Sequence, residues 1–94
     1  MTHEQELIKA GKARDFLENE IFKEAFAEVE QALLAGIKQS AFKDAELREK
    51  LCQQYNLLHN LKDRIAVYIE TGQIAEEEIK RRSISQAVKE FLHV

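Results

Sequence analysis

The 94-residue chain contains no proline, no tryptophan, three glycines and one cysteine. Because proline and glycine are the residues that most often interrupt helices, their scarcity favours a chain built almost entirely of helix. A single cysteine, Cys52, excludes an intrachain disulfide and suits a reducing compartment. No apolar run approaches about 18 residues, so we expect no transmembrane helix. Residues 1–6 are polar and acidic, which is not typical of a signal peptide.

The charge balance gives no excess of basic residues. Fourteen basic and seventeen acidic residues give a formal net charge of −3, whereas dedicated nucleic-acid binders usually carry a basic excess. The length predicts a single domain over residues 1–94. A chain of this size buries only about 60–65% of its unfolded surface, so association with another copy or with a partner would stabilise it.

Residues 44–71 carry an unbroken seven-residue repeat of mainly apolar residues. One series is Leu47, Gln54, Leu61 and Tyr68, and the other is Leu51, Leu58 and Ile65. Alternating steps of three and four place both series on one stripe of a helix. Such a helix is about 40 Å long, and a second helix must cover its stripe.

The preceding segment supplies that second helix, predicted over residues 20–38 with Phe22, Phe26 and Val29 on its apolar face. Asn19 is the predicted N-cap, with a helix continuous through residues 17–20 as the alternative. The short connection 39–43 and the N-cap residue Asp44 favour an antiparallel arrangement. The predicted fold is therefore all-α, with a central antiparallel hairpin of about 20–38 and 44–71 and additional helices at both termini.

Those terminal helices have their own markers. Thr2 and Gln5 form a capping-box pattern that opens the N-terminal helix. Gly11 either weakens this helix by about 1 kcal/mol or lets a neighbouring backbone approach closely. Gly72 is expected to end the long helix in the left-handed conformation, with a further helix starting at residue 74. At Ser83 the sequence permits either a break or continuing helix.

Few residues are arranged for chemistry. We find no phosphate-binding loop, no nucleophile–histidine–acid grouping and no paired carboxylates, so we expect no enzyme and no cofactor. The residues Cys52, Asn56, His59 and Asp63 share one helix face and could in principle ligate a metal. One helix rarely supplies a full ligand set, and a semi-polar flank beside the leucine stripe is the favoured interpretation, so no metal site is predicted.

Three sets of residues are candidates for binding. The predicted self-association set, if the hairpin leaves part of that face open, is Leu51, Gln54, Leu58, Leu61, Ile65 and Tyr68. Gln54 either fixes register and oligomeric state or reaches water. The predicted partner-docking set, for which ordinary packing is the alternative, is Ile84, Val88, Phe91 and Leu92. The basic run Lys80, Arg81 and Arg82 could contact phosphates, although glutamates four residues earlier would support a self-neutralised helix instead.

The order of residues also resembles a known family. The segments that carry the likeness are 16–26 (FLENEIFKEAF), Val29–Glu30, Leu33–Leu34, Ser40, Asp44, 46–49, Leu58, Leu61, Ile65 and 69–75 (IETGQIA). They resemble small helical proteins encoded in the head and portal gene clusters of tailed bacteriophages and prophages. The likeness covers about residues 10–75 and implies a phage context but no catalytic residue.

Taken with the resemblance, the expected function is that of a non-enzymatic phage protein for virion assembly, head assembly or DNA packaging. It would act by helical oligomerisation or by docking on a larger phage structural or host protein, in the host cytoplasm or in the virion, without a membrane partner. One alternative is a small DNA-binding packaging or regulatory protein that uses residues 80–82. Another is an inhibitor of a host or host-defence protein, which the acidic surface permits.

Overall fold

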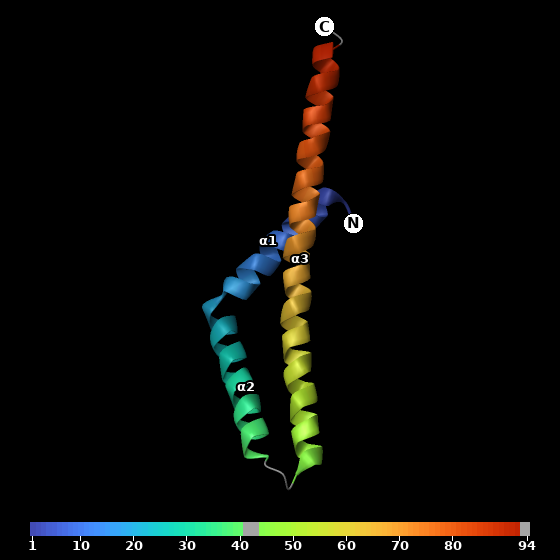
Figure 1. Cartoon of the computed structure of the whole chain (residues 1–94). Coiled ribbons are helices and arrows are strands. Elements are labelled where there is room, and N and C mark those ends of the chain that lie inside the picture. Colours follow the sequence, from blue (N-terminus) through green and yellow to red (C-terminus); the bar gives the residue numbers. More distant parts are fainter. Residues whose placement is uncertain (41–43, 93–94) are drawn as a thin grey trace. The chain divides into compact units, whose positions relative to one another are not determined.

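The structure is a computed structural model that describes residues 1–40 and 44–92. Within these residues the chain forms three helices and no strand: α1 (His3–Glu18), α2 (Glu20–Gln39) and α3 (Ala45–Leu92) (Figure 1). The all-α prediction is confirmed. None of the helices, as far as they are described, has an apolar stretch that could span a lipid bilayer.

Each helix begins at a polar side chain that accepts a backbone hydrogen bond. Gln5 donates its N–H to Thr2 Oγ1 (3.2 Å), and Thr2 donates its N–H to Gln5 Oε1 (2.9 Å), which completes the capping box. Asn19 Oδ1 accepts the N–H of Phe22 at 3.0 Å, and Asp44 Oδ1 accepts the N–H three residues further on at 3.1 Å. The predicted caps are confirmed, and the alternative of an unbroken helix through residue 19 is wrong.

Removal of the Asn19 cap should weaken the protein measurably. In Asn19→Ala the N–H of Phe22 loses its acceptor, so the free energy of unfolding should fall by about 1 kcal/mol. Asn60→Ala, at an exposed position inside α3, is the control and should be neutral or slightly stabilising because alanine is the better helix former. Urea unfolding of both variants checks this, and equal stabilities would contradict the role of Asn19.

The predicted helix end at Gly72 is wrong, because α3 continues without a break from Ala45 to Leu92. No glycine in the described part of the chain has a positive φ. The predicted separate C-terminal helix is therefore the second half of α3, and of the two possibilities at Ser83 the continuing helix is the one observed. Gly72 is instead buried where α1 contacts α3, and the contact leaves no room for a side chain at this position.

The chain divides into two compact units. We call Met1–Asp15 with Ala66–Val94 the terminal unit and Phe16–Ile65 the hairpin unit. The prediction of a single domain stays a prediction.

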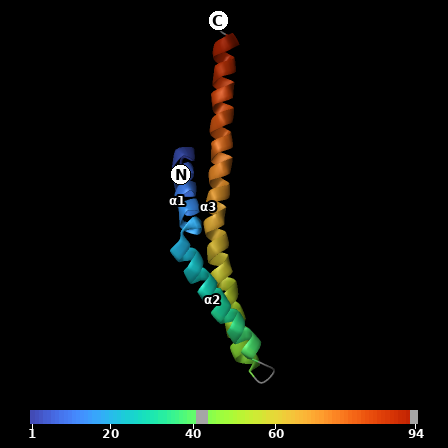
Figure 2. The same ribbon diagram turned by 90° about the vertical axis from the view of Figure 1, so that its left-hand side faces the viewer.

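In the terminal unit, α1 lies beside α3 (Figure 2). Small residues form the contact between them. Ala10, Ala13 and Ala75 are buried, and Ala75 has no exposed surface. A Cβ atom placed on Gly72 would overlap the Cβ atom of Ala10 and lie 3.3 Å from the carbonyl oxygen of Glu6. The close backbone approach predicted as one possibility for Gly11 is therefore found at Gly72. At Gly11 itself, a Cβ atom would meet nothing within 4 Å.

In the hairpin unit, α2 contacts the first half of α3. A Cβ atom on Gly36 would lie 3.0 Å from Leu51 Cδ1. His59 Nε2 donates a hydrogen bond to Glu30 Oε2 at 2.6 Å. Further along, Lys62 Nζ lies 4.7 Å from the centre of the Phe26 ring. The partners on α3 advance in number as those on α2 decrease, so the contacts are consistent with the predicted antiparallel hairpin.

The predicted connection between these helices is described only in part. Gln39 is the last residue of α2, and Ser40 is its C-cap, with its N–H bonded to the carbonyl of Gly36 at 2.9 Å. Ala41, Phe42 and Lys43 lie outside the described residues.

Candidate functional site

The interior of the hairpin unit is aromatic and polar. Phe26 lies 5.8 Å from Phe22 and 5.4 Å from His59, measured between ring centres, and Tyr55 lies 4.5 Å from His59. The hydrogen bond between His59 and Glu30 joins the two helices at the same level. No large side chain among the described residues is fully buried. In the described part of the hairpin, ring contacts and a polar pair therefore join the helices, and the aliphatic side chains between them are at most half-buried.

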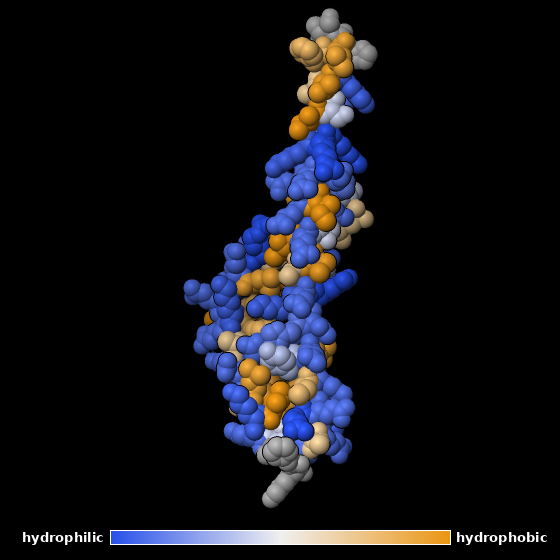
Figure 3. All heavy atoms as spheres, viewed as in Figure 1, coloured by the Kyte–Doolittle hydropathy of each residue, from blue (hydrophilic) through white to orange (hydrophobic). Residues whose placement is uncertain are grey.

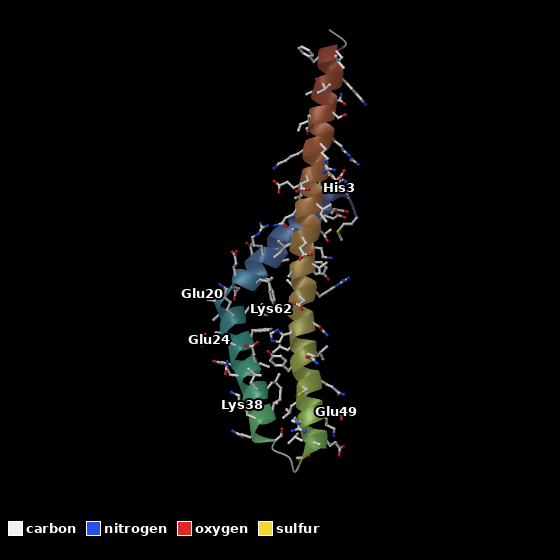
Figure 4. All side chains as sticks on the ribbon, in the orientation of Figure 1. His3, Glu20, Glu24, Lys38, Glu49 and Lys62 are labelled. Atoms are coloured by element: carbon white, nitrogen blue, oxygen red, sulfur yellow. The ribbon has the colours of Figure 1, made fainter. Side chains whose placement is uncertain are left out.

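One side of the hairpin has a cavity of about 310 Å³ beside this cluster, between Phe22, Phe26, Glu30 and Lys62. Lys62 extends from α3 toward α2 over the Phe26 ring (Figure 4). The Glu30 carboxylate is already bound to His59. Within residues 1–40 and 44–92 no group of three or more His, Cys, Asp or Glu could hold a metal ion. The expectations of no metal and no enzyme stay predictions.

The other side of the same two helices has an apolar groove of about 460 Å³. Its lining residues are Val29, Leu33, Gln54, Leu57, Leu58 and Leu61. Leu57 is 69% exposed, Leu61 60% and Val29 48%. Since Gln54 is the one polar side chain in this lining, the groove has the composition of a surface that accepts the apolar face of another helix.

The predicted self-association residues are only partly brought together in this groove. Gln54, Leu58 and Leu61 line it, whereas Leu51 lies against Gly36 and Ile65 is half-buried. Tyr68 belongs to the terminal unit, where Lys9 Nζ lies 3.8 Å from its ring centre.

Three groove residues were not predicted as association residues: Val29, Leu33 and Leu57. Leu57 lies beside the seven-residue stripe and not on it. The feature of the sequence that could have identified Leu57 is the adjacent pair Leu57–Leu58, because two neighbouring leucines make an apolar face wider than a two-helix contact needs.

The predicted docking residues lie on the last turns of α3. Residues 80–92 are all exposed, and Figure 3 shows apolar side chains uncovered at this end of the helix. Phe91 is 80% exposed, and Ile84, Val88 and Leu92 are each at least half exposed. The segment is therefore an amphipathic helix with an uncovered apolar face, and its docking role stays a prediction.

The basic run lies among acidic neighbours. Lys80 Nζ is 3.4 Å from a carboxylate oxygen of Glu76, and Arg81 Nη1 is 3.5 Å from one of Glu78. The Arg81 pair spans three residues, where a spacing of four from Glu77 was predicted. Because such exposed pairs offset the positive charge locally, they reduce the attraction for phosphate. Nucleic-acid contact by Lys80, Arg81 and Arg82 stays a prediction.

The chain matches no protein-family model, no curated protein and no solved structure. The resemblance to the phage proteins therefore stays a prediction.

Proposed function

We propose that the protein is a non-enzymatic association subunit, which works by burying its exposed apolar helix faces against protein surfaces during the assembly of a larger particle. One observation carries this proposal. Among the described residues the buried apolar side chains are three alanines, while leucine, isoleucine, valine and phenylalanine side chains line an open groove and the end of α3.

This distribution is the reverse of the usual one, in which the largest apolar side chains lie inside. Complete burial of a leucine or phenylalanine side chain contributes about 1.5–3 kcal/mol. For Leu57, Leu61 and Phe91 most of that free energy is not used within the chain, because these side chains are largely exposed. The free energy of burying these side chains is therefore available to stabilise association with another protein surface. Contiguous exposed apolar surface commonly marks protein–protein association sites.

The biological setting of the proposal is a tailed phage, where the partner is a phage structural protein, a host protein or another copy of this chain. That setting rests on the resemblance of residues 10–75 alone. We do not adopt the DNA-binding alternative, because Lys80 and Arg81 each lie beside a glutamate.

Site-specific photocrosslinking tests the proposal. A benzophenone amino acid at Leu57 or Phe91, in cells that also express the neighbouring genes, should give adducts of discrete mass after irradiation. Glu49 is the control position, because it is exposed and lies on the side of α3 away from α2 (Figure 4). Absence of adducts at both apolar positions, or equal yields at Glu49, would contradict the proposal.

A further inference from the structure

We propose that the groove of the hairpin unit is filled by the same groove of a second copy, so that α2 of each copy packs on α3 of the other in an antiparallel four-helix bundle. This inference rests on the proposed function and names the partner for one of its surfaces. Three features of the groove support it: the sizes of the side chains on its two rims, the register of the helices and the charges along its outer margins.

The two rims of the groove differ in side-chain size. On α2 the groove is lined by the exposed Val29 and the half-buried Leu33. The exposed residues next to Val29 on the outer rim of this helix are small, Ala25 and Ala32. On α3 the corresponding residues are Leu57 and Leu61. A dimer that sets α2 on α3 places leucines over alanines and valine, which allows close packing. A dimer that packs α2 on α2 and α3 on α3 would instead place leucine against leucine and leave space between the alanines.

The register within one chain fixes which residues meet. Glu30 is level with His59, and Phe26 is level with Lys62. A two-fold axis parallel to the helices leaves these levels unchanged, so each α2 residue faces the part of the second copy that is level with it. Leu61 of the second copy then lies between Ala25 and Val29, and its Leu57 lies between Val29 and Ala32.

The charges beside the groove favour the same arrangement. The 100° step of the helix places Glu24 and Glu28 on the outer margin of α2, and Arg64 on the outer margin of α3 next to the groove. Asp63 lies one further step round α3, farther from the groove than Arg64. When α2 packs on α3 of the second copy, these margins are adjacent, with Arg64 level with Glu24 and one turn from Glu28. Packing like helices together would instead place the two acidic margins side by side, which is unfavourable.

A disulfide-trapping experiment separates the two arrangements. Two chains are mixed, each carrying Cys52→Ser, one with Ala25→Cys and the other with Leu61→Cys, and are then oxidised. The proposal predicts a disulfide-linked heterodimer in higher yield than either homodimer. Val29→Cys in the same background probes the like-on-like arrangement and should give little homodimer. The reverse result, with a Val29→Cys homodimer and no Ala25–Leu61 heterodimer, would overturn the proposal.

Charge exchange tests the register independently. Glu24→Arg should weaken dimerisation on the order of tenfold, because a two-fold dimer contains the altered contact twice. The double variant Glu24→Arg/Arg64→Glu should restore most of that loss. Within one chain these residues lie on opposite outer margins of the hairpin, so restoration reports a contact between copies. If the double variant is no better than Glu24→Arg while keeping its helical circular dichroism, the proposed register is wrong.

Different results are expected if the dimer is wrong and if the proposed association function is wrong. A chain that remains monomeric but is crosslinked at Leu57 to another protein would overturn the second copy as occupant and leave the association function standing. A chain that neither dimerises nor crosslinks at either apolar surface would overturn both.

Discussion

Gly72→Ala is expected to lower the free energy of unfolding by about 1–2 kcal/mol. Alanine in place of glycine normally stabilises the interior of a helix by about 1 kcal/mol. Here the new Cβ atom would overlap the Cβ atom of Ala10 and crowd the carbonyl oxygen of Glu6. Neither is the end of a flexible side chain, so α1 itself must move, and overpacking of this kind costs about 1–3 kcal/mol or more. The steric term should therefore exceed the gain in helix propensity.

Gly11→Ala is the matched control, because a Cβ atom at Gly11 meets nothing within 4 Å. The same chemical change should there raise the free energy of unfolding by up to about 1 kcal/mol. Urea unfolding of both variants gives the comparison. A Gly72→Ala protein as stable as Gly11→Ala would contradict the close packing of α1 on α3.

Phe26→Ala should have the largest effect on the hairpin unit, a loss of about 2–3 kcal/mol. Truncation of a fully buried phenylalanine costs about 3–5 kcal/mol, and Phe26 is only half-buried. Its ring nevertheless contacts Phe22 and His59 and lies under the ammonium group of Lys62. Loss of the ring therefore removes contacts both within α2 and between α2 and α3.

Phe91→Ala removes the same side chain from a site that is 80% exposed, so the change in stability should be within about 0.5 kcal/mol. Thermal unfolding of the two variants at one protein concentration makes the comparison, since association would otherwise shift the midpoints. If both substitutions cost the same, the aromatic cluster does not hold the hairpin.

The helix starts were predictable from sequence because they depend on local bonds. Thr2 with Gln5, Asn19 and Asp44 each bond to a backbone group three residues away, and such spacings are visible in the sequence. Gly72 shows the limit of this reasoning. Whether a glycine ends a helix or lies at a helix contact depends here on Ala10, which is remote in sequence.

The groove could be predicted only in part for a related reason. The seven-residue repeat identifies Leu58 and Leu61, and both line the groove. It does not identify Val29 or Leu57, because the side left open depends on how both helices are rotated about their own axes. That rotation is set by the contacts of Phe26, His59 and Glu30 across the hairpin, which no single-helix pattern contains.

Sedimentation equilibrium over a concentration series tests the central claim, that the groove is buried by association between copies, most directly. The wild-type chain should change from its single-chain mass of 10.9 kDa to twice that mass as concentration rises. Leu61→Asp should stay at the single-chain mass and remain helical, because a carboxylate in the groove would have to be desolvated on association. A wild-type protein that keeps the single-chain mass at every concentration, or a Leu61→Asp variant that dimerises as well as wild type, would contradict the account.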